Sequence, residues 1–143
     1  MQVLSISDIM IKMPITISPV TKVDEVARVL RNNKISSVIL VTNGKPVGIV
    51  TERDLVHRVL AADKESRNLM AADICTAPVI TVSIHTSIED AVAKMIDHKI
   101  RRLVVTDKDQ VIGIVTADDI GYNLKRISEA LAVKYLSLIK RQK

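Results

Sequence analysis

Threonine and aspartate recur three residues apart in two nearly identical heptapeptides, GIVTERD at residues 48–54 and GIVTADD at residues 113–119. In a Thr-x-x-acid pattern at the start of a helix, the two side chains can satisfy backbone amides that the helix leaves unpaired, an arrangement called a capping box. The same geometry could also hold a ligand. Thr51, Asp54, Thr116 and Asp119 are therefore candidates for a helix cap, a binding site, or both.

The heptapeptides belong to a longer internal repeat. Shifting the chain against itself by 65 residues aligns positions 8–55 with positions 73–120 without a gap, and thirteen of the 48 aligned pairs are identical. Self-similarity at a fixed period over most of the chain indicates a tandem duplication.

Both copies predict the element order β-α-β-β-α. A short alternating strand comes first, ITIS at 15–18 and ITVS at 80–83, and a helix-capping threonine follows each (Thr21 and Thr86). Apolar residues then recur every three or four positions, as on one buried helix face. Two β-branched runs follow, and Asn43-Gly44 is typical of a tight hairpin turn. Each hairpin ends in the GIVTxxD string and leads into a second helix.

These patterns predict an α+β fold of two repeats related by pseudo-twofold symmetry, each with a short helical lead-in (SISDIM and NLMAADI). We expect residues 1–61 to hold the first repeat and its lead-in, residues 62–121 the second repeat, and residues 122–143 a C-terminal helix. One copy of about 50 residues would bury too little apolar surface to be secure alone. The two repeats are therefore expected to form one globular unit.

The C-terminal segment has the spacing of an amphipathic helix. It holds six Lys and Arg residues against Glu129, which accounts for the net charge of +5. Packing against the repeats or a second subunit is the first expectation, and contact with a membrane surface or a nucleic acid is the alternative. Its apolar face is expected to consist of Leu124, Ile127, Leu131, Tyr135, Leu138 and Ile139.

Composition argues against several classes of protein. The chain has two Tyr, no Phe and no Trp, so it offers few rings on which nucleic-acid bases could stack. Cys75 is the single cysteine, expected to be a small buried apolar residue rather than a reactive thiol. No nucleophile motif, phosphate-cradling loop or set of metal ligands is present. We expect no enzyme activity, catalytic cofactor or metal site, and, without an apolar span or signal peptide, a cytoplasmic protein.

The lead-in DIM, the strand ITIS, the hairpin, and above all GIVTERDL and GIVTADDI resemble the CBS domain, named for cystathionine β-synthase, in its usual tandem pair, the Bateman module. The resemblance spans roughly residues 3–121. It implies a regulatory, energy-sensing module that binds adenosine nucleotides such as AMP, ADP or ATP, and in some members S-adenosylmethionine or NAD. The ligands lie in clefts between the two repeats.

The resemblance also assigns roles by position. Asp54 and Asp119 match the family aspartate that accepts hydrogen bonds from the ribose hydroxyls, and a carboxylate suits a vicinal diol. Thr51 and Thr116 match the hydroxyl that faces the ribose or phosphate. The apolar walls and backbone groups that hold adenine are matched by Ile15, Thr16, Ile35, Ile80, Thr81 and Ile100.

Phosphate contacts are expected to differ between the copies. Family members often place basic residues just before the second strand, where the second copy has Arg101 and Arg102 and the first has Ser36 and Ser37. Arginine suits phosphate because its planar fork donates two hydrogen bonds. Adjacent strand residues point to opposite faces, so one of the two arginines would face a given cleft. We therefore expect two related but unequal sites.

Structural alternatives stay open for each of these residues. The Thr and Asp pairs could serve as helix caps alone. The two arginines could lie on a solvated surface or pair with Asp107 or Asp109. Arg53, inside the first string, could supply compensating charge for phosphate, whereas its counterpart Asp118 would repel it.

Two functions follow from these residues. The first is a stand-alone ligand-sensing switch, a homodimer of repeat pairs that binds an adenosine nucleotide and regulates another protein. The alternative is a scaffold or interaction module with vestigial clefts, whose basic tail recruits a protein or nucleic acid.

Overall fold

The chain folds into two compact units that do not follow the order of the sequence. The structure, a computed structural model, describes residues 4–123 and 129–141. Residues 14–79 form one unit, here called the central unit, and residues 1–13 together with 80–143 form the other, called the flanking unit. None of the helices in the described ranges has the length and apolar character needed to cross a bilayer.

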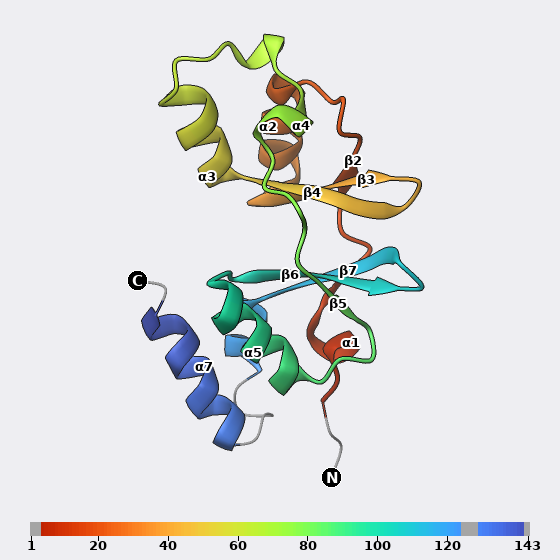
Figure 1. Ribbon diagram of the computed structural model, residues 1–143, viewed down its shortest axis with the longest axis vertical. Coiled ribbons are helices and arrows are strands. Elements are labelled where there is room, and N and C mark those ends of the chain that lie inside the picture. The colour runs from red at the N-terminus through yellow and green to blue at the C-terminus, as the bar shows by residue number, and fades with distance from the viewer. Residues whose placement is uncertain (1–3, 124–128, 142–143) are drawn as a thin grey trace. The chain divides into compact units, whose positions relative to one another are not determined.

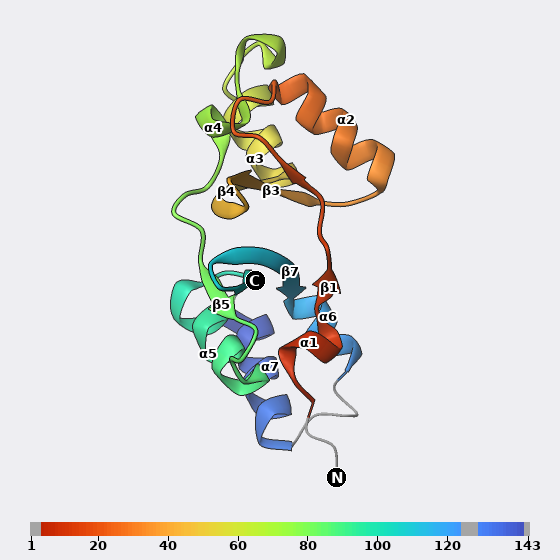
Figure 2. The same cartoon turned by 90° about the vertical axis from the view of Figure 1, so that its right-hand side faces the viewer.

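The central unit is a three-stranded sheet with its helices on one face (Figures 1 and 2). The strand order is β2-β3-β4, with β2 parallel to β3 and β3 antiparallel to β4. A π-helical segment, η1, continues α3 without a break. The elements are β2 (Thr16–Ile17), α2 (Val23–Asn33), β3 (Ser37–Thr42), β4 (Lys45–Thr51), α3 (Glu52–Leu55), η1 (Val56–Leu60), η2 (Ser66–Asn68) and α4 (Ala71–Ile74).

The flanking unit repeats this plan and adds a strand and a helix (Figure 2). Its strand order is β1-β7-β6-β5, with β5 parallel to β6 and the other neighbours antiparallel. The elements are α1 (Ile6–Ile9), β1 (Ile11–Lys12), β5 (Thr81–Ser83), α5 (Ile88–His98), β6 (Arg102–Asp107), β7 (Gln110–Thr116), α6 (Ala117–Tyr122) and α7 (Glu129–Arg141). The predicted α+β class and the β-α-β-β-α order of both copies are confirmed. The capping role predicted for Thr21 and Thr86 is wrong, because Lys22 and Ser87 are the N-cap residues of α2 and α5.

The register of the sheets preserves the 65-residue repeat. Ser37 pairs with Thr51 across β3 and β4, and Arg102 pairs with Thr116 across β6 and β7. Both hairpins also carry a register shift at equivalent positions. The two copies therefore keep the same backbone pairing although most side chains differ.

The lead-in helices pack in the unit opposite to their sequence neighbours. Ile6 and Ile9 of α1 are buried in the flanking core, whereas Ala71 and Ile74 of α4 are buried in the central core. Each short helix can bury its apolar face only against a sheet, because four residues cannot form a core alone. The division in space therefore lies at residues 13/14 and 79/80, not at the 61/62 boundary expected from the repeats.

The repeated glycine of the GIVT string makes room for this exchange. A Cβ at Gly48 would lie 2.7 Å from Cys75 Sγ, and a Cβ at Gly113 would lie 2.5 Å from Met10 Sδ. Met10 and Cys75 are themselves 65 residues apart, directly after α1 and α4. The glycine is thus explained by packing of the lead-in segment on the hairpin.

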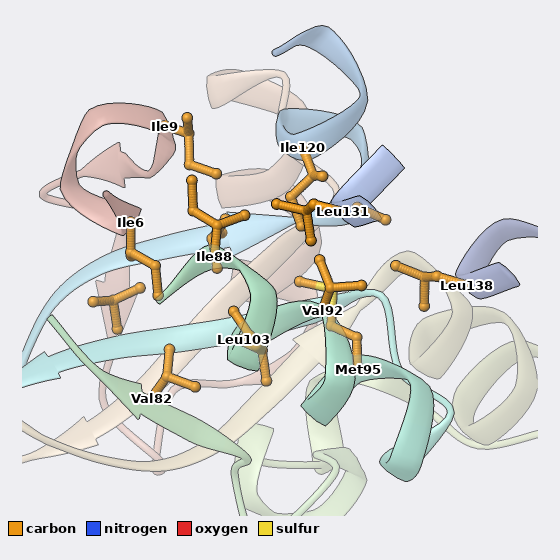
Figure 3. Close-up of a cluster of buried hydrophobic side chains, with 14 residues drawn as sticks. Ile6, Ile9, Val82, Ile88, Val92, Met95, Leu103, Ile120, Leu131 and Leu138 are labelled. Carbon is orange, nitrogen blue, oxygen red and sulfur yellow. The ribbon is translucent and has the colours of Figure 1, made fainter. Parts of the chain in front are cut away.

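Helix α7 covers the flanking unit, as the spacing of its apolar residues predicts. Leu131 and Leu138 are buried in the flanking core, and Figure 3 shows Leu131 next to Ile120 of α6. Tyr135 and Ile139 pack partly buried against the same core. The other two residues expected on this face, Leu124 and Ile127, lie outside the described residues. The expectation that the tail packs on its own repeats is confirmed for α7.

Gly121 allows α7 to approach α6. A Cβ at this position would lie 2.5 Å from Tyr135 Oη and 3.1 Å from its ring. The equivalent residue of the central unit is Val56, whose side chain is 50% exposed. Position 121 therefore needs the smallest side chain because a helix packs there.

We expect Gly121→Ala to destabilise the chain by about 1–3 kcal/mol, the usual cost of forcing an extra methyl into a packed site. In a Tyr135→Ala background the same substitution should be neutral or stabilise by up to about 1 kcal/mol, because alanine favours a helix over glycine. Denaturant unfolding of the four chains checks this reversal of sign. Equal effects of Gly121→Ala in both backgrounds would contradict the role assigned to Tyr135.

Candidate functional site

The sheet register brings the predicted site segments together at one end of each unit. Because β2 is parallel to β3 and β3 is antiparallel to β4, the starts of β2 and β3 and the end of β4 lie at the same end of the sheet. Thr16 opens β2, Ser37 opens β3, and Thr51 closes β4. The flanking unit has the same arrangement with Thr81, Arg102 and Thr116.

Both Thr-x-x-Asp strings form complete capping boxes. The amide of Thr51 donates to Asp54 Oδ2 at 2.9 Å, and the amide of Asp54 donates to Thr51 Oγ1 at 3.2 Å. The matching distances for Thr116 and Asp119 are 2.8 and 3.2 Å. The helix-capping role predicted for these residues is confirmed. It uses one oxygen of each aspartate, so the second oxygen can accept hydrogen bonds from other groups.

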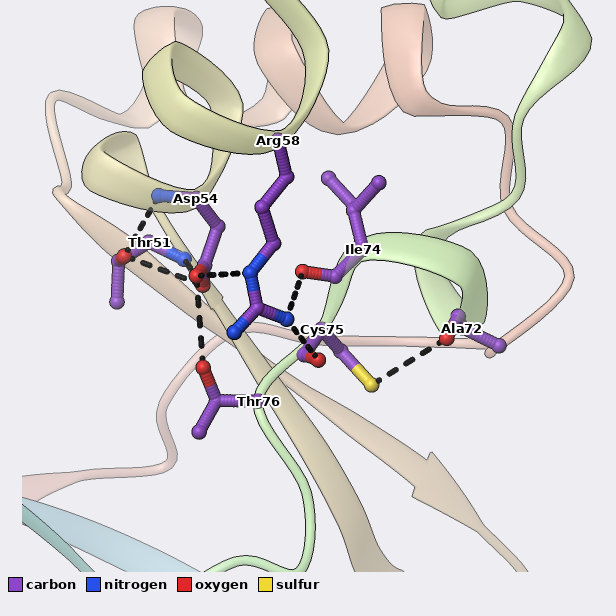
Figure 4. A network of polar contacts seen from close by, with 7 residues as sticks. All are labelled: Thr51, Asp54, Arg58, Ala72, Ile74, Cys75 and Thr76. Carbon is purple, nitrogen blue, oxygen red and sulfur yellow. Dashed lines mark hydrogen bonds and ion pairs between the residues drawn. The ribbon is translucent and has the colours of Figure 1, made fainter. Parts of the chain in front are cut away.

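Asp54 is held in a wider network (Figure 4). Its Oδ1 accepts from the hydroxyl of Thr76 at 3.4 Å and lies 3.6 Å from Arg58 Nε. Nη1 of Arg58 also donates to the carbonyls of Ile74 and Cys75, at 3.2 and 2.8 Å. Asp54 is the one charged residue buried in the described ranges, with 7% of its surface exposed. The arginine and the two hydroxyls offset the cost of burying this charge.

Asp119 lacks this second set of partners. The hydroxyl of Thr116 donates to its Oδ2 at 3.0 Å, as the hydroxyl of Thr51 does to Asp54. Asn123 occupies the position equivalent to Arg58, but its Nδ2 donates to the backbone carbonyl of Asp119 at 2.7 Å. Asp119 is half-buried. In the described ranges, no group donates to its Oδ1.

The two arginines of the second copy have different surroundings. Arg102 lies directly across from Thr116 in the β6 and β7 pair, so their side chains are neighbours on one face of the sheet. Arg101 is exposed and its Nη2 lies 3.4 Å from Asp118 Oδ1. An exposed pair of this kind contributes little to stability. The partner of Arg101 is thus Asp118 rather than Asp107 or Asp109, and Arg102 is the arginine beside the Thr116 site.

The first copy has a serine, not an arginine, at the position across from its threonine. Ser37 lies across from Thr51, at the position equivalent to Arg102. Ser36 is exposed, and its carbonyl accepts the amide of Glu52 at the start of α3. Arg53 is also exposed, on the first turn of α3. The residues predicted from sequence to contact phosphate therefore occupy equivalent positions in the two units but differ in charge.

The residues expected to wall an adenine ring are mostly shared with the cores. Ile35, Ile80 and Ile100 pack partly buried against the core of their own unit. Ile15 is 37% exposed, and Thr16 is exposed at the start of β2. The carbonyl of Thr81 accepts from Lys94 Nζ at 2.6 Å, whereas the residue equivalent to Lys94 in the central unit is Val29.

Sequence reasoning missed Arg58, Thr76 and Lys94. A signal for Arg58 existed, since it follows Asp54 by four residues on a helix and the repeat replaces it with Asn123. Thr76 carried no such signal, because its contact with Asp54 depends on the exchange of α4 into the central unit.

Cys75 is half-buried against the central core, where its thiol lies 3.6 Å from the carbonyl of Ala72. Burial raises the pKa of the Cys75 thiol, the carboxylate of Asp54 raises it further, and Arg58 opposes these effects. The thiol is therefore protonated at neutral pH, the form in which cysteine is a weak nucleophile. No group of three or more His, Cys, Asp or Glu residues that could hold a metal ion occurs in the described ranges.

We expect iodoacetamide to alkylate Cys75 more slowly at neutral pH than it alkylates N-acetylcysteine. Because the pKa is raised, the rate should reach its midpoint at a higher pH than for the free thiol. Mass spectrometry of the intact chain across a pH series measures this, with urea-unfolded protein as the reference. A midpoint at or below that of the free thiol would contradict the effect of burial.

Comparison with known proteins identifies a protein family and several relatives that this chain resembles. A family model described as the CBS domain matches the chain twice, at residues 6–61 and 71–124. An uncharacterised protein of Methanopyrus kandleri is 40% identical over 122 residues, which is 84% of this chain. The chain spans 62% of the length of that relative.

Two solved structures are similar in fold and carry bound ligands. The CBS domain pair of protein MJ0100, in complex with 5′-methylthioadenosine and S-adenosyl-L-methionine, is 31% identical with a TM-score of 0.76 over 85% of this chain and 99% of that one. A CBS domain protein of Pyrobaculum aerophilum, complexed with AMP, is 25% identical with a TM-score of 0.77 over 94% and 99% of the two chains.

Proposed function

This chain belongs to the CBS domain family, with two copies of the domain in tandem, and on that premise we propose that it is a regulatory module that binds an adenosine ligand. Similar proteins have been solved with AMP, 5′-methylthioadenosine or S-adenosyl-L-methionine bound. All three ligands share an adenine base on a ribose with a 2′,3′-diol. The proposed ligand class for this chain is therefore adenosine nucleotides and related adenosine compounds.

The observation that carries the proposal is the convergence of three strand ends on each Thr-x-x-Asp string. In the flanking unit this end of the sheet combines the Asp119 carboxylate with Arg102, which lies across from Thr116. A carboxylate can accept from the ribose hydroxyls, and an arginine fork can donate to a phosphate. The apolar residues near this end, Ile80 and Ile100, offer surface for adenine in a chain with few aromatic rings.

The proposed action of the module is a ligand-dependent switch rather than a reaction. A ligand shifts a conformational equilibrium only as far as its affinities for the two states differ. We propose that the chain acts on another protein, as a dimer with a second copy. Val56 and Leu60 on η1, 50% and 75% exposed, support such self-association because they are apolar and uncovered in the single chain.

The alternative function, a scaffold whose C-terminal helix recruits a partner, has less support than the ligand-binding proposal. A recruiting helix needs an available face, but Leu131 and Leu138 are buried in the flanking core. Lys134, one of its basic residues, pairs with Glu89 at 2.8 Å. The large apolar side chains that α7 exposes, among its described residues, are Val133 and Leu136, at 61% and 62%.

The sensor proposal predicts a rise in melting temperature with at least one of AMP, ADP, ATP, S-adenosylmethionine and NAD. A ligand at 100 times its dissociation constant stabilises the folded state by about 2.7 kcal/mol. Isothermal titration calorimetry then gives the affinity and the number of sites. If none of these compounds at millimolar concentration shifts the transition, the sensor proposal fails and the scaffold remains.

A second prediction concerns the phosphate. Arg102→Ser, which introduces the residue of the first copy, should weaken AMP binding about tenfold or more, because a hydrogen bond to a charged group is lost. Adenosine binding should change little. Arg101→Ser is the matched control and should have the smaller effect, since Arg102 and not Arg101 lies across from Thr116. Equal losses for AMP and adenosine in the Arg102 variant would exclude a phosphate contact.

A further inference from the structure

Asp54 and Asp119 hold equivalent places in the two repeats but differ in how many of their acceptor sites are in use. A carboxylate has about four such sites, two on each oxygen. In Asp54, Oδ2 accepts from the amide and hydroxyl of Thr51, while Oδ1 accepts from Thr76 and faces Arg58. Both oxygens of Asp54 thus face donors within the chain, with three hydrogen bonds and one ion pair at 3.6 Å, on a side chain that is nearly buried.

Asp119 uses only half of this capacity. Its Oδ2 accepts from the amide and hydroxyl of Thr116, at 2.8 and 3.0 Å. In the part of the chain that the structure describes, Oδ1 accepts nothing, and the residue is half-buried rather than buried. About two acceptor sites therefore remain, the number that a vicinal diol requires.

Two substitutions between the repeats account for this difference. Arg58, four residues after Asp54, is replaced by Asn123, which bonds to the backbone of Asp119 and not to its carboxylate. The counterpart of Thr76 is Ile11, which has no hydroxyl. Both changes remove a donor from the same oxygen of the aspartate.

Arg58 is also tied in place by other contacts. Its Nη1 donates to the carbonyls of Ile74 and Cys75, at the end of α4 (Figure 4). A ligand that took the Oδ1 of Asp54 would have to displace an arginine held at three points. In the first repeat, the contacts of the Asp54 carboxylate are therefore made within the chain.

We propose that Arg58 and Thr76 reserve Asp54 as a structural anchor, so that the chain binds one adenosine ligand, with the ribose diol on Asp119. This inference rests on the proposed function and adds which repeat supplies the ribose acceptor. Arg58 acts as a positioning residue that sets the number of sites, without contacting the ligand.

The first test transfers the arginine to the second repeat. Asn123→Arg places a guanidinium four residues after Asp119, the spacing of Asp54 and Arg58, and should weaken AMP binding about tenfold or more. Asn123→Gln is the matched control, because it lengthens the side chain without adding charge, and should bind AMP like the natural chain. Asp119→Asn should lose affinity as Asn123→Arg does. Calorimetry with AMP on the full chain measures all four proteins.

The second test gives the first repeat the residues of the second. The double variant Arg58→Asn, Thr76→Ile should free the Oδ1 of Asp54 and raise the binding from one AMP per chain to two. Circular dichroism and thermal unfolding check that it remains folded. If it unfolds, the comparison of Asn123→Arg with Asn123→Gln decides the question alone.

The outcomes separate this inference from the proposed function. Two AMP molecules bound per natural chain, or AMP binding that survives both Asp119→Asn and Asn123→Arg, would overturn the inference and leave the sensor function standing. A folded double variant that binds no second AMP would also count against it. If the natural chain binds no adenosine ligand, the proposed function itself fails, and this inference fails with it.

Discussion

Four helices of this chain depend on an aspartate that reaches back to a backbone amide at the helix start. Asp8 and Asp73 accept the amides of Ser5 and Met70, at 2.7 and 2.8 Å, as the aspartates of the two Thr-x-x-Asp strings do for their threonines. Helices of four to six residues cannot offset unpaired terminal amides by length. These caps fix where each strand turns into a helix, and the orientation of each carboxylate follows.

Duplication then allowed the same carboxylate to acquire different surroundings. In the central unit the exchanged α4 segment and η1 close around Asp54 with a hydroxyl and a guanidinium. In the flanking unit, the positions that would supply these donors hold an apolar residue and an amide. The two sheets have equivalent residue pairing, yet one unit has a buried carboxylate paired with an arginine and the other has a carboxylate with unused acceptor sites.

The helix α7 shows the same divergence in packing. It covers α5 and α6 of the flanking unit, where Gly121 leaves space for Tyr135. On the central unit Val56 fills that position, and the side chain of Arg31 replaces the apolar Ile96 of the other copy. At these two positions the flanking unit has a glycine and an apolar side chain where α7 packs, whereas the central unit has a larger side chain and a charge.

The sequence by itself determined the two repeats, which appear when the chain is aligned with itself. It also determined the element order, the capping boxes of the two Thr-x-x-Asp strings and the amphipathic tail helix, because each of these depends on residues a few positions apart. Tertiary structure alone decided which lead-in joins which sheet, and hence that Thr76 meets Asp54 and that Gly48 faces Cys75. It also decided that Arg101 pairs with Asp118. These contacts join residues 17 to 27 positions apart, and spacing along a chain carries no information about pairs that only packing brings together.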